Sequence, residues 1–133
     1  MAYLIDSDLV IDHLDDDPAA RRLLDRLAEA GIMISLITYM EVSQGALLSP
    51  DPAAAQAKLD EFLAGVPIVP CSLAVAKRCA QLRAQLHRQH KRVRSRALDL
   101  LNAATALEHG LTLVTRNLSD YDDIPELSLY QPS

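Results

Sequence analysis

Four acidic residues, far apart in the chain, occupy positions that a parallel α/β sheet would bring together. Each directly follows an expected strand or lies near the start of an expected helix. Because the crevices of such sheets form at the carboxyl ends of the strands, we expect the four carboxylates to share one sheet edge. They are Asp6, Glu41, Asp99 and Asp120.

The chemistry that suits such a cluster is the binding of a divalent cation. Two like charges about 4 Å apart repel by roughly 4 kcal/mol at an effective dielectric of 20, so a fold keeps carboxylates together when a cation offsets their charge. Mg²⁺ and Mn²⁺ prefer oxygen ligands, and Mg²⁺ also retains water molecules. The four acids therefore predict a site for Mg²⁺ or Mn²⁺.

Each acid also has a purely structural interpretation. Asp6 and Asp8 could cap the helix that follows them. Thr38 and Glu41 have the spacing of a capping box, and the two later acids could favour a helix dipole and cap a turn. Each of these alternatives explains one position, and none explains all four.

Strands and helices are expected to alternate along the chain, which predicts a parallel sheet with helices on both faces. Apolar runs bounded by turn residues indicate the strands, and apolar residues at helical spacing indicate the helices. No linker divides the 133 residues, so we expect one domain over residues 1–133. The expected strands are residues 3–5, 32–35, 67–70 and 111–114, with a short edge strand at 127–130, and the expected helices are residues 9–14, 18–30, 38–48, 52–65, 73–90 and 97–109.

Composition narrows the class of protein. Half of the residues are hydrophobic, only 4% are aromatic, and no run approaches the length of a membrane span. The amino terminus lacks the basic region and the cleavage site of a signal peptide. Cys71 and Cys79 fit neither a disulfide framework nor a metal finger, so we expect both to be small apolar fillers. These features predict a soluble cytoplasmic protein with no membrane partner.

The charged residues are distributed unevenly. The net charge of −5 argues against a protein that simply coats nucleic acid. From Arg83 to Arg96, however, six basic residues and two histidines occur without an acid, whereas acids crowd residues 6–17 and 120–126. An acidic cluster facing a basic stripe suits an anionic substrate that is cut with the help of a metal. A solvated helix face is the alternative interpretation of the stripe.

Several segments resemble PIN-domain ribonucleases and, within that family, the VapC-type toxins of bacterial toxin–antitoxin pairs. The resemblance covers nearly the whole chain, and the motifs occur in the family's order. Its four acidic positions fall on the four acids named above, its small hydroxyl residue falls on Ser7, and its polar residue before the last acid falls on Asn117. The segments are residues 3–8, the helix that carries Glu41, residues 99–106 and residues 115–121.

The resemblance implies a three-layer α/β/α PIN-like domain with a short central parallel sheet and a metal-dependent endoribonuclease activity. Asp6, Glu41 and Asp99 would hold one Mg²⁺ or Mn²⁺, directly or through water, and Asp120 would complete or tune the site. A metal-activated water would attack the phosphorus and leave a 5′-phosphate and a 3′-hydroxyl. The supporting residues would be Ser7, Asp8, Thr115 and Asn117, and the candidates for holding RNA are Arg88, Lys91, Arg92, Arg94, Arg96 and Arg116.

The resemblance also implies a homodimer and a cognate antitoxin protein. The chain departs from the family's pattern in three places. The family usually has asparagine at the position of Asp8 and often has a proline shortly before the third acid, where this chain has residues 94–96. Asn102 stands where an aliphatic residue is more usual, and it could hydrogen-bond the acidic cluster or lie at an interface.

Two other functions are consistent with parts of the sequence. The segment from Asp6 to Val10 fits the opening D-x-D-x-V of haloacid-dehalogenase-like phosphatases, in which two aspartates act as nucleophile and acid/base. Asp122 and Asp123 could imitate the late acidic pair of those enzymes. A non-catalytic PIN-like binding module with vestigial acids is the other alternative.

Overall fold

The computed structural model describes residues 2–131, and its centre is a short, fully parallel sheet of four strands. The strand order is β3-β2-β1-β4, so the first strand of the chain lies inside the sheet, between β2 and β4. In register, Tyr3 pairs with both Ile32 and Thr112, and Ile5 pairs with Val114. The strands are β1 (Tyr3–Ile5), β2 (Ile32–Ser35), β3 (Ile68–Val69) and β4 (Thr112–Val114).

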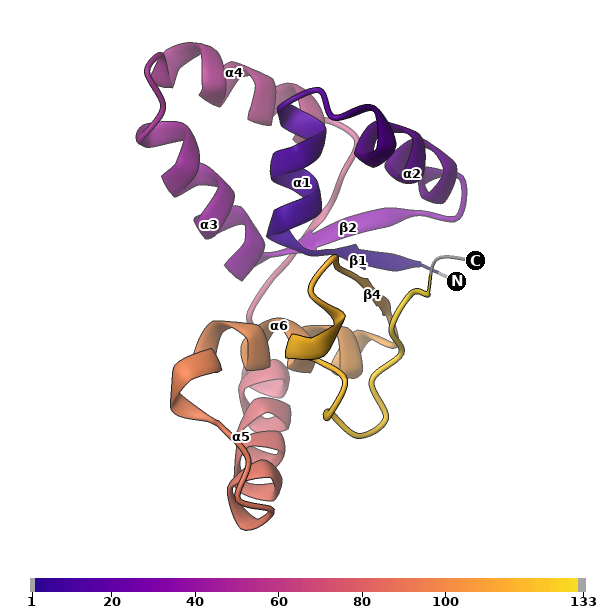
Figure 1. The fold of residues 1–133 in the computed structure, drawn as a ribbon, viewed down its shortest axis with the longest axis vertical. Coiled ribbons are helices and arrows are strands. Elements are labelled where there is room, and N and C mark those ends of the chain that lie inside the picture. Colours follow the sequence, from indigo (N-terminus) through magenta and orange to yellow (C-terminus); the bar gives the residue numbers. More distant parts are fainter. Residues whose placement is uncertain (1, 132–133) are drawn as a thin grey trace.

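Helices cover both faces of this sheet, which confirms the expected three-layer α/β/α architecture. The first four helices cover one face and the last two cover the other (Figure 1). The helices are α1 (Ser7–Leu14), α2 (Pro18–Ala28), α3 (Leu36–Leu47), α4 (Pro52–Leu63), α5 (Leu73–Arg88) and α6 (Ala97–His109), and the 3₁₀ turns are η1 (Arg94–Arg96) and η2 (Leu118–Asp120).

The two hydrophobic cores follow from the alternation of side chains along a strand. In β1, Leu4 is buried among residues of α5 and α6, whereas Ile5 is buried among residues of α1, α2 and α4. Leu113 and Val114 of β4 alternate in the same way. Both cores are built mainly from aliphatic residues, as the low aromatic content predicts. No helix within residues 2–131 combines the length and the apolar character that a membrane span requires.

Helix ends follow the local sequence signals. Asp17 caps α2 by accepting a hydrogen bond from the backbone N–H of Ala20 at 3.0 Å, with Pro18 at the first helical position. Ser72 caps α5, and α6 ends at Gly110, whose φ of +63° lies in the left-handed region. These three ends confirm the expected helix boundaries.

Three expectations from the sequence need correction. The helix expected from Thr38 begins at Leu36, because the Ser35 hydroxyl accepts a hydrogen bond from the Thr38 N–H at 3.1 Å and acts as the N-cap. Glu41 therefore lies beyond the first turn, and the capping-box interpretation is wrong. The expected strand at 127–130 is reduced to an isolated parallel bridge between Leu113 and Leu129, and Cys71 is exposed rather than buried.

Candidate active site

Asp6 lies at the carboxyl end of β1, where the strand gives way to α1. Its backbone N–H donates to the Val114 carbonyl at 2.9 Å, which fixes it against the end of β4. Its carboxylate accepts from the Ser7 N–H at 2.8 Å, so Asp6 is also the N-cap of α1. The capping interpretation and the site interpretation therefore apply to the same residue.

The Asp6 carboxylate is buried, and each of its two oxygens accepts two hydrogen bonds. Oδ1 accepts from the Ser7 N–H at 2.8 Å and from the Asn102 Nδ2 at 3.4 Å. Oδ2 accepts from the Thr115 hydroxyl at 2.8 Å and from the Tyr121 hydroxyl at 3.3 Å. Despite these donors, burial and the neighbouring charge of Asp8 raise the pKa of Asp6 to about 6.

A single hydroxyl joins Asp6 to the second candidate acid. The Tyr121 hydroxyl lies 3.2 Å from Oδ1 of Asp99, in addition to its contact with Asp6. Asp99 occupies the first turn of α6 and is half-buried. Burial raises the pKa of Asp99, and the charge of Asp120 adds to the rise. Carboxylates from β1 and α6 therefore converge on one point.

The other two candidate acids are Glu41 in α3 and Asp120 in η2. Burial raises the pKa of Glu41, a hydrogen bond from the Ser7 side chain lowers it, and the charges of Asp99 and Asp8 raise it further. Asp120 ends η2, where its backbone N–H donates to the Asn117 carbonyl at 3.0 Å. The backbone therefore turns between these two residues without a side-chain cap. Asp99 therefore lies within electrostatic range of Asp6, Glu41 and Asp120.

Asp8 holds the turn after β4 in place. Its Oδ2 accepts from the Arg116 N–H at 3.0 Å and from the Asn117 Nδ2 at 3.1 Å, and it lies 3.3 Å from the Thr115 hydroxyl, which donates to Asp6 at the shorter distance of 2.8 Å. Its Oδ1 accepts from the Leu9 N–H at 2.7 Å. These contacts make Asp8 the residue that holds the turn of residues 115–117 against the start of α1. The side-chain amide of Asn117 is part of this arrangement.

The basic residues proposed to hold RNA fall into two groups. The Arg96 guanidinium is buried and makes two hydrogen bonds of 2.9 Å to the Asp123 carboxylate, and it also donates to the Asp120 carbonyl at 3.2 Å. This position does not fit an RNA contact. Arg116 is exposed but lies 3.1 Å from Asp12. The other candidates are exposed at the end of α5 and in the loop that follows: Arg88, Lys91, Arg92 and Arg94.

Sequence reasoning missed the role of Tyr121 and left that of Asn102 open. Tyr121 directly follows the fourth acid within the motif, but its burial and its two carboxylate contacts depend on the tertiary fold. Asn102 lies three residues after Asp99, so a polar side chain on the same helix face was the available signal. The structure confirms that Asn102 hydrogen-bonds the cluster.

The donor set fits a hydrated divalent ion. Within residues 2–131, no three acidic, histidine or cysteine side chains lie close enough to hold one ion together. Mg²⁺ commonly binds through one or two carboxylates and keeps several waters. Asp6 and Asp99, which share the Tyr121 hydroxyl, form such a pair of oxygen donors, and Glu41 and Asp120 could contribute through water.

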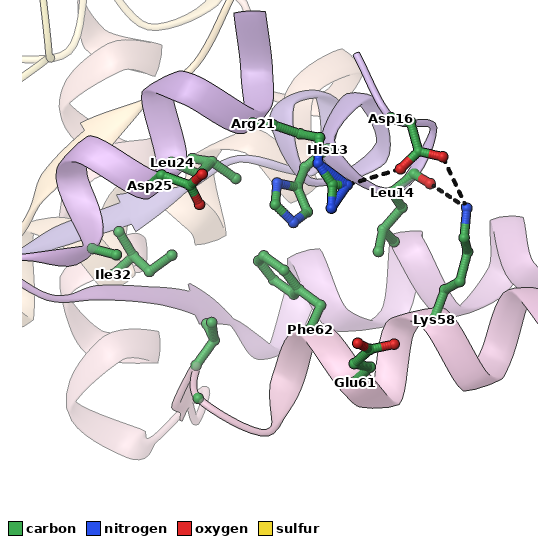
Figure 2. Close-up of a pocket in the computed structure, with 13 residues that line it drawn as sticks. His13, Leu14, Asp16, Arg21, Leu24, Asp25, Ile32, Lys58, Glu61 and Phe62 are labelled. Atoms are coloured by element: carbon green, nitrogen blue, oxygen red, sulfur yellow. Dashed lines mark hydrogen bonds and ion pairs between the residues drawn. The ribbon is translucent and has the colours of Figure 1, made fainter. Parts of the chain in front are cut away.

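A separate cavity of about 410 Å³ lies at the other end of α1, between α1, α2 and α4 (Figure 2). The His13 ring lies over Phe62, with the ring centroids 5.0 Å apart, and Lys58 and Arg21 both bond Asp16 at the rim. None of the four candidate acids lines it. The acidic cluster and this cavity are distinct features of the surface.

Comparisons with known proteins show the family to which the chain belongs. A family model described as the PIN domain matches residues 3–126. Ribonuclease VapC2 of Rickettsia felis is 30% identical over 131 residues, which cover 97% of this chain and 96% of that protein. The tRNA(fMet)-specific endonuclease VapC of Shigella flexneri is 27% identical over 124 residues, which cover 93% of this chain and 92% of that protein.

Among solved structures, the crystal structure of VapBC2 from Rickettsia felis bound to a DNA fragment from their promoter contains a similar chain. Its TM-score is 0.90 at 28% identity, and the match covers 100% of both chains. A three-layer α/β/α domain with acids gathered at the carboxyl end of its central strands, similar over its length to ribonucleases, is a nuclease domain. The chain belongs to the PIN-domain family, and within it to the VapC-type endoribonuclease toxins.

This assignment replaces the phosphatase alternative. Asp8 would be the acid/base of that reaction, but its carboxylate accepts hydrogen bonds from the turn of residues 115–117. Asp123 of the late acidic pair is bound to Arg96. The vestigial-module alternative is likewise displaced by the similarity to ribonucleases over nearly the whole chain.

Proposed function

We propose that this toxin cleaves RNA with one bound Mg²⁺ or Mn²⁺ and that the whole chain, residues 1–133, acts as a single PIN domain. The observation that carries the proposal is the Tyr121 hydroxyl lying within 3.3 Å of both Asp6 and Asp99. These two carboxylates come from separate elements and are held at one point although burial disfavours their charge. A cation would relieve that cost.

In this proposal the four acids have different tasks. Asp6 and Asp99 would hold the ion directly, and Glu41 and Asp120 would do so through water. When bound, the ion supplies an activated water and neutralises charge on the scissile phosphate. Ser7 orients Glu41 through its hydrogen bond, and Thr115 orients Asp6. The water would attack in line and leave a 5′-phosphate and a 3′-hydroxyl.

The proposed substrate is structured RNA, with transfer RNA as the first to be tested. The relative from Shigella flexneri is named as specific for tRNA(fMet). The chain has four tyrosines, one phenylalanine and no tryptophan, so it has few rings on which to stack unpaired bases. Recognition through backbone shape and charge therefore fits this chain better than base-by-base readout.

The test is cleavage of purified transfer RNA by antitoxin-free protein with Mg²⁺, Mn²⁺ or EDTA. The Asp99→Asn variant is expected to lose at least about 100-fold in kcat/KM, because it removes one of the two direct ligands. Asp25→Asn, which changes an exposed acid on α2, is the matched control and should cut like the wild type. Cutting that persists in EDTA, or that survives in Asp99→Asn, would contradict a metal mechanism at this site.

The exposed part of the basic stripe provides a second prediction. Arg92 lies close enough to Asp99 to lower its pKa, which places this loop beside the acids. Replacing Arg92 and Arg94 with methionine should raise KM for RNA with little change in kcat, and each substitution should reduce the salt dependence of binding by about one in the log–log slope. Arg22→Met on α2 is the control. An unchanged KM and salt slope would remove this loop from the RNA path.

We also propose a homodimer, a cognate antitoxin partner and a cytoplasmic location. Several large apolar side chains are exposed, and Leu36, Met40 and Leu47 lie at helical spacing along α3. Such a stripe suits a protein contact. The similar solved structure is a VapBC complex, which supports an antitoxin partner for this chain. An RNA substrate fits a cytoplasmic protein.

A further inference from the structure

A continuous chain of buried hydrogen bonds connects the start of α3 to Asp6. The Thr38 N–H donates to the Ser35 hydroxyl oxygen at 3.1 Å, and the Ser35 hydroxyl donates to the Asn102 Oδ1 at 2.7 Å. The Asn102 Nδ2 then donates to Oδ1 of Asp6 at 3.4 Å. All four residues are buried, between 0% and 7% exposed. These hydrogen bonds link the residue after β1 to residues of β2, α3 and α6.

Every bond in this chain points in the same direction, from the helix towards the carboxylate. Hydrogen bonds arranged in one direction polarise one another, and the amino terminus of a helix carries a partial positive charge. This series of hydrogen bonds therefore extends the positive electrostatic potential of the α3 amino terminus to Oδ1 of Asp6, where it stabilises the negative charge. An apolar residue at position 102 would break this series at the last link.

The two oxygens of Asp6 have donors of different kinds. The donors to Oδ1 are fixed, because one is a backbone N–H of α1 and the other is an amide anchored by Ser35. The donors to Oδ2 are hydroxyls with a second acceptor within reach. Thr115 lies 3.3 Å from Asp8, and Tyr121 lies 3.2 Å from Asp99. Oδ2 can thus be freed by rotation of two hydroxyls, whereas Oδ1 cannot.

We propose that Asn102 is a positioning residue for metal binding, which holds Oδ1 of Asp6 and leaves Oδ2 as the oxygen that takes the cation. This inference rests on the proposed metal-dependent function. The proposed role explains why this chain has an asparagine at a position where an aliphatic residue is more usual in the family. Ser35 is the second link of the same device, because it aligns the Asn102 amide.

The experiment measures Mn²⁺ binding to RNA-free protein by titration calorimetry for the wild type, Asn102→Leu and Ser35→Ala. Loss of an outer partner of a metal ligand typically weakens binding by about 10–100-fold, and we expect a change of this size for Asn102→Leu and a smaller one for Ser35→Ala. Cleavage by Asn102→Leu should recover most of its kcat at saturating Mn²⁺. Thr105→Val is the matched control, because Thr105 is equally buried on α6 and bonds only the Leu101 carbonyl among the contacts described.

The possible failures are distinguishable. If the wild type binds no Mn²⁺, or if Asp6→Asn binds it equally well, the proposed metal site is wrong. If the wild type binds Mn²⁺ at Asp6 and cuts RNA, and both Asn102→Leu and Ser35→Ala bind Mn²⁺ as tightly as the wild type, the positioning role alone is overturned. Should Asn102→Leu fail to fold, an unchanged affinity in Ser35→Ala overturns it as well.

Discussion

The Asp6→Asn variant is expected to lose RNA cleavage and, in the absence of metal, to be more stable than the wild type. The variant removes a proposed metal ligand, so its kcat/KM should fall by at least about 1,000-fold. It also removes a buried negative charge. The Thr115 and Tyr121 hydroxyls can accept from an asparagine amide while donating to Asp8 and Asp99, so the substitution leaves satisfied partners.

The sign and size of the stability change follow from the pKa of Asp6. Its value in the folded protein is about 6, against 3.8 for an unperturbed group, which corresponds to an upper limit of about 3 kcal/mol. Because the folded value is the higher one, ionised Asp6 destabilises the fold fully above pH 6, and the cost disappears as the pH falls towards 4. We expect Asp6→Asn to gain about 1–3 kcal/mol at pH 7.5.

Urea unfolding in EDTA, repeated between pH 5 and 8, checks this expectation. The wild type should become more stable as the pH is lowered, and Asp6→Asn should show a smaller gain. Added Mn²⁺ should stabilise the wild type at pH 7.5 and leave Asp6→Asn unchanged. Asp25→Asn serves as the control for removal of an exposed charge. A variant less stable than the wild type at pH 7.5 would show that the Asp6 carboxylate stabilises the metal-free fold.

Replacing Arg96 with methionine is expected to cause the largest loss of stability in the basic stripe. Arg96 is 6% exposed and binds both oxygens of Asp123, the Arg92 carbonyl and the Asp120 carbonyl. Removing one partner of a buried ion pair costs about 3–5 kcal/mol, and the partial exposure of Asp123 reduces this to about 2–4 kcal/mol. Urea unfolding at pH 7.5 measures the change.

The neighbouring Arg94 provides a matched comparison. It belongs to the same turn but is exposed, so Arg94→Met should alter the free energy of unfolding by less than about 0.5 kcal/mol. The two substitutions should therefore have different effects: Arg96→Met should lower the stability of the fold, and Arg94→Met should weaken RNA binding. Equal stability of the two variants would show that the Arg96–Asp123 pair contributes little to the fold.

Local sequence signals were sufficient to predict most of the fold. The caps at Asp17 and Ser72 and the terminator at Gly110 act within a few residues, so their effect is visible in the sequence. The start of α3 is harder to predict because Ser35 and Thr38 are both good capping residues, and only the backbone geometry chooses between them. An acid that directly follows a strand, such as Asp6, can be placed at the sheet edge from sequence because parallel strands direct their carboxyl ends to one edge.

The surroundings of those acids were less predictable because they depend on contacts between distant residues. Charge alone gives the same expectation for Arg96 and Arg94, yet one is buried against Asp123 and the other is exposed. From its sequence position, Tyr121 would be predicted to be an ordinary core residue. Only the tertiary structure shows its hydroxyl between two carboxylates. Such distinctions require the tertiary structure.

The position of β1 inside the sheet has a consequence for synthesis of the protein. Asp6 is synthesised 109 residues before its partner Thr115 and 115 residues before its partner Tyr121, and the adjacent strand β4 is also made long after it. Contacts between residues this far apart in sequence form late and slowly. A growing chain therefore carries Asp6 without these partners, and the surroundings of its carboxylate can form only after residue 121 has been made.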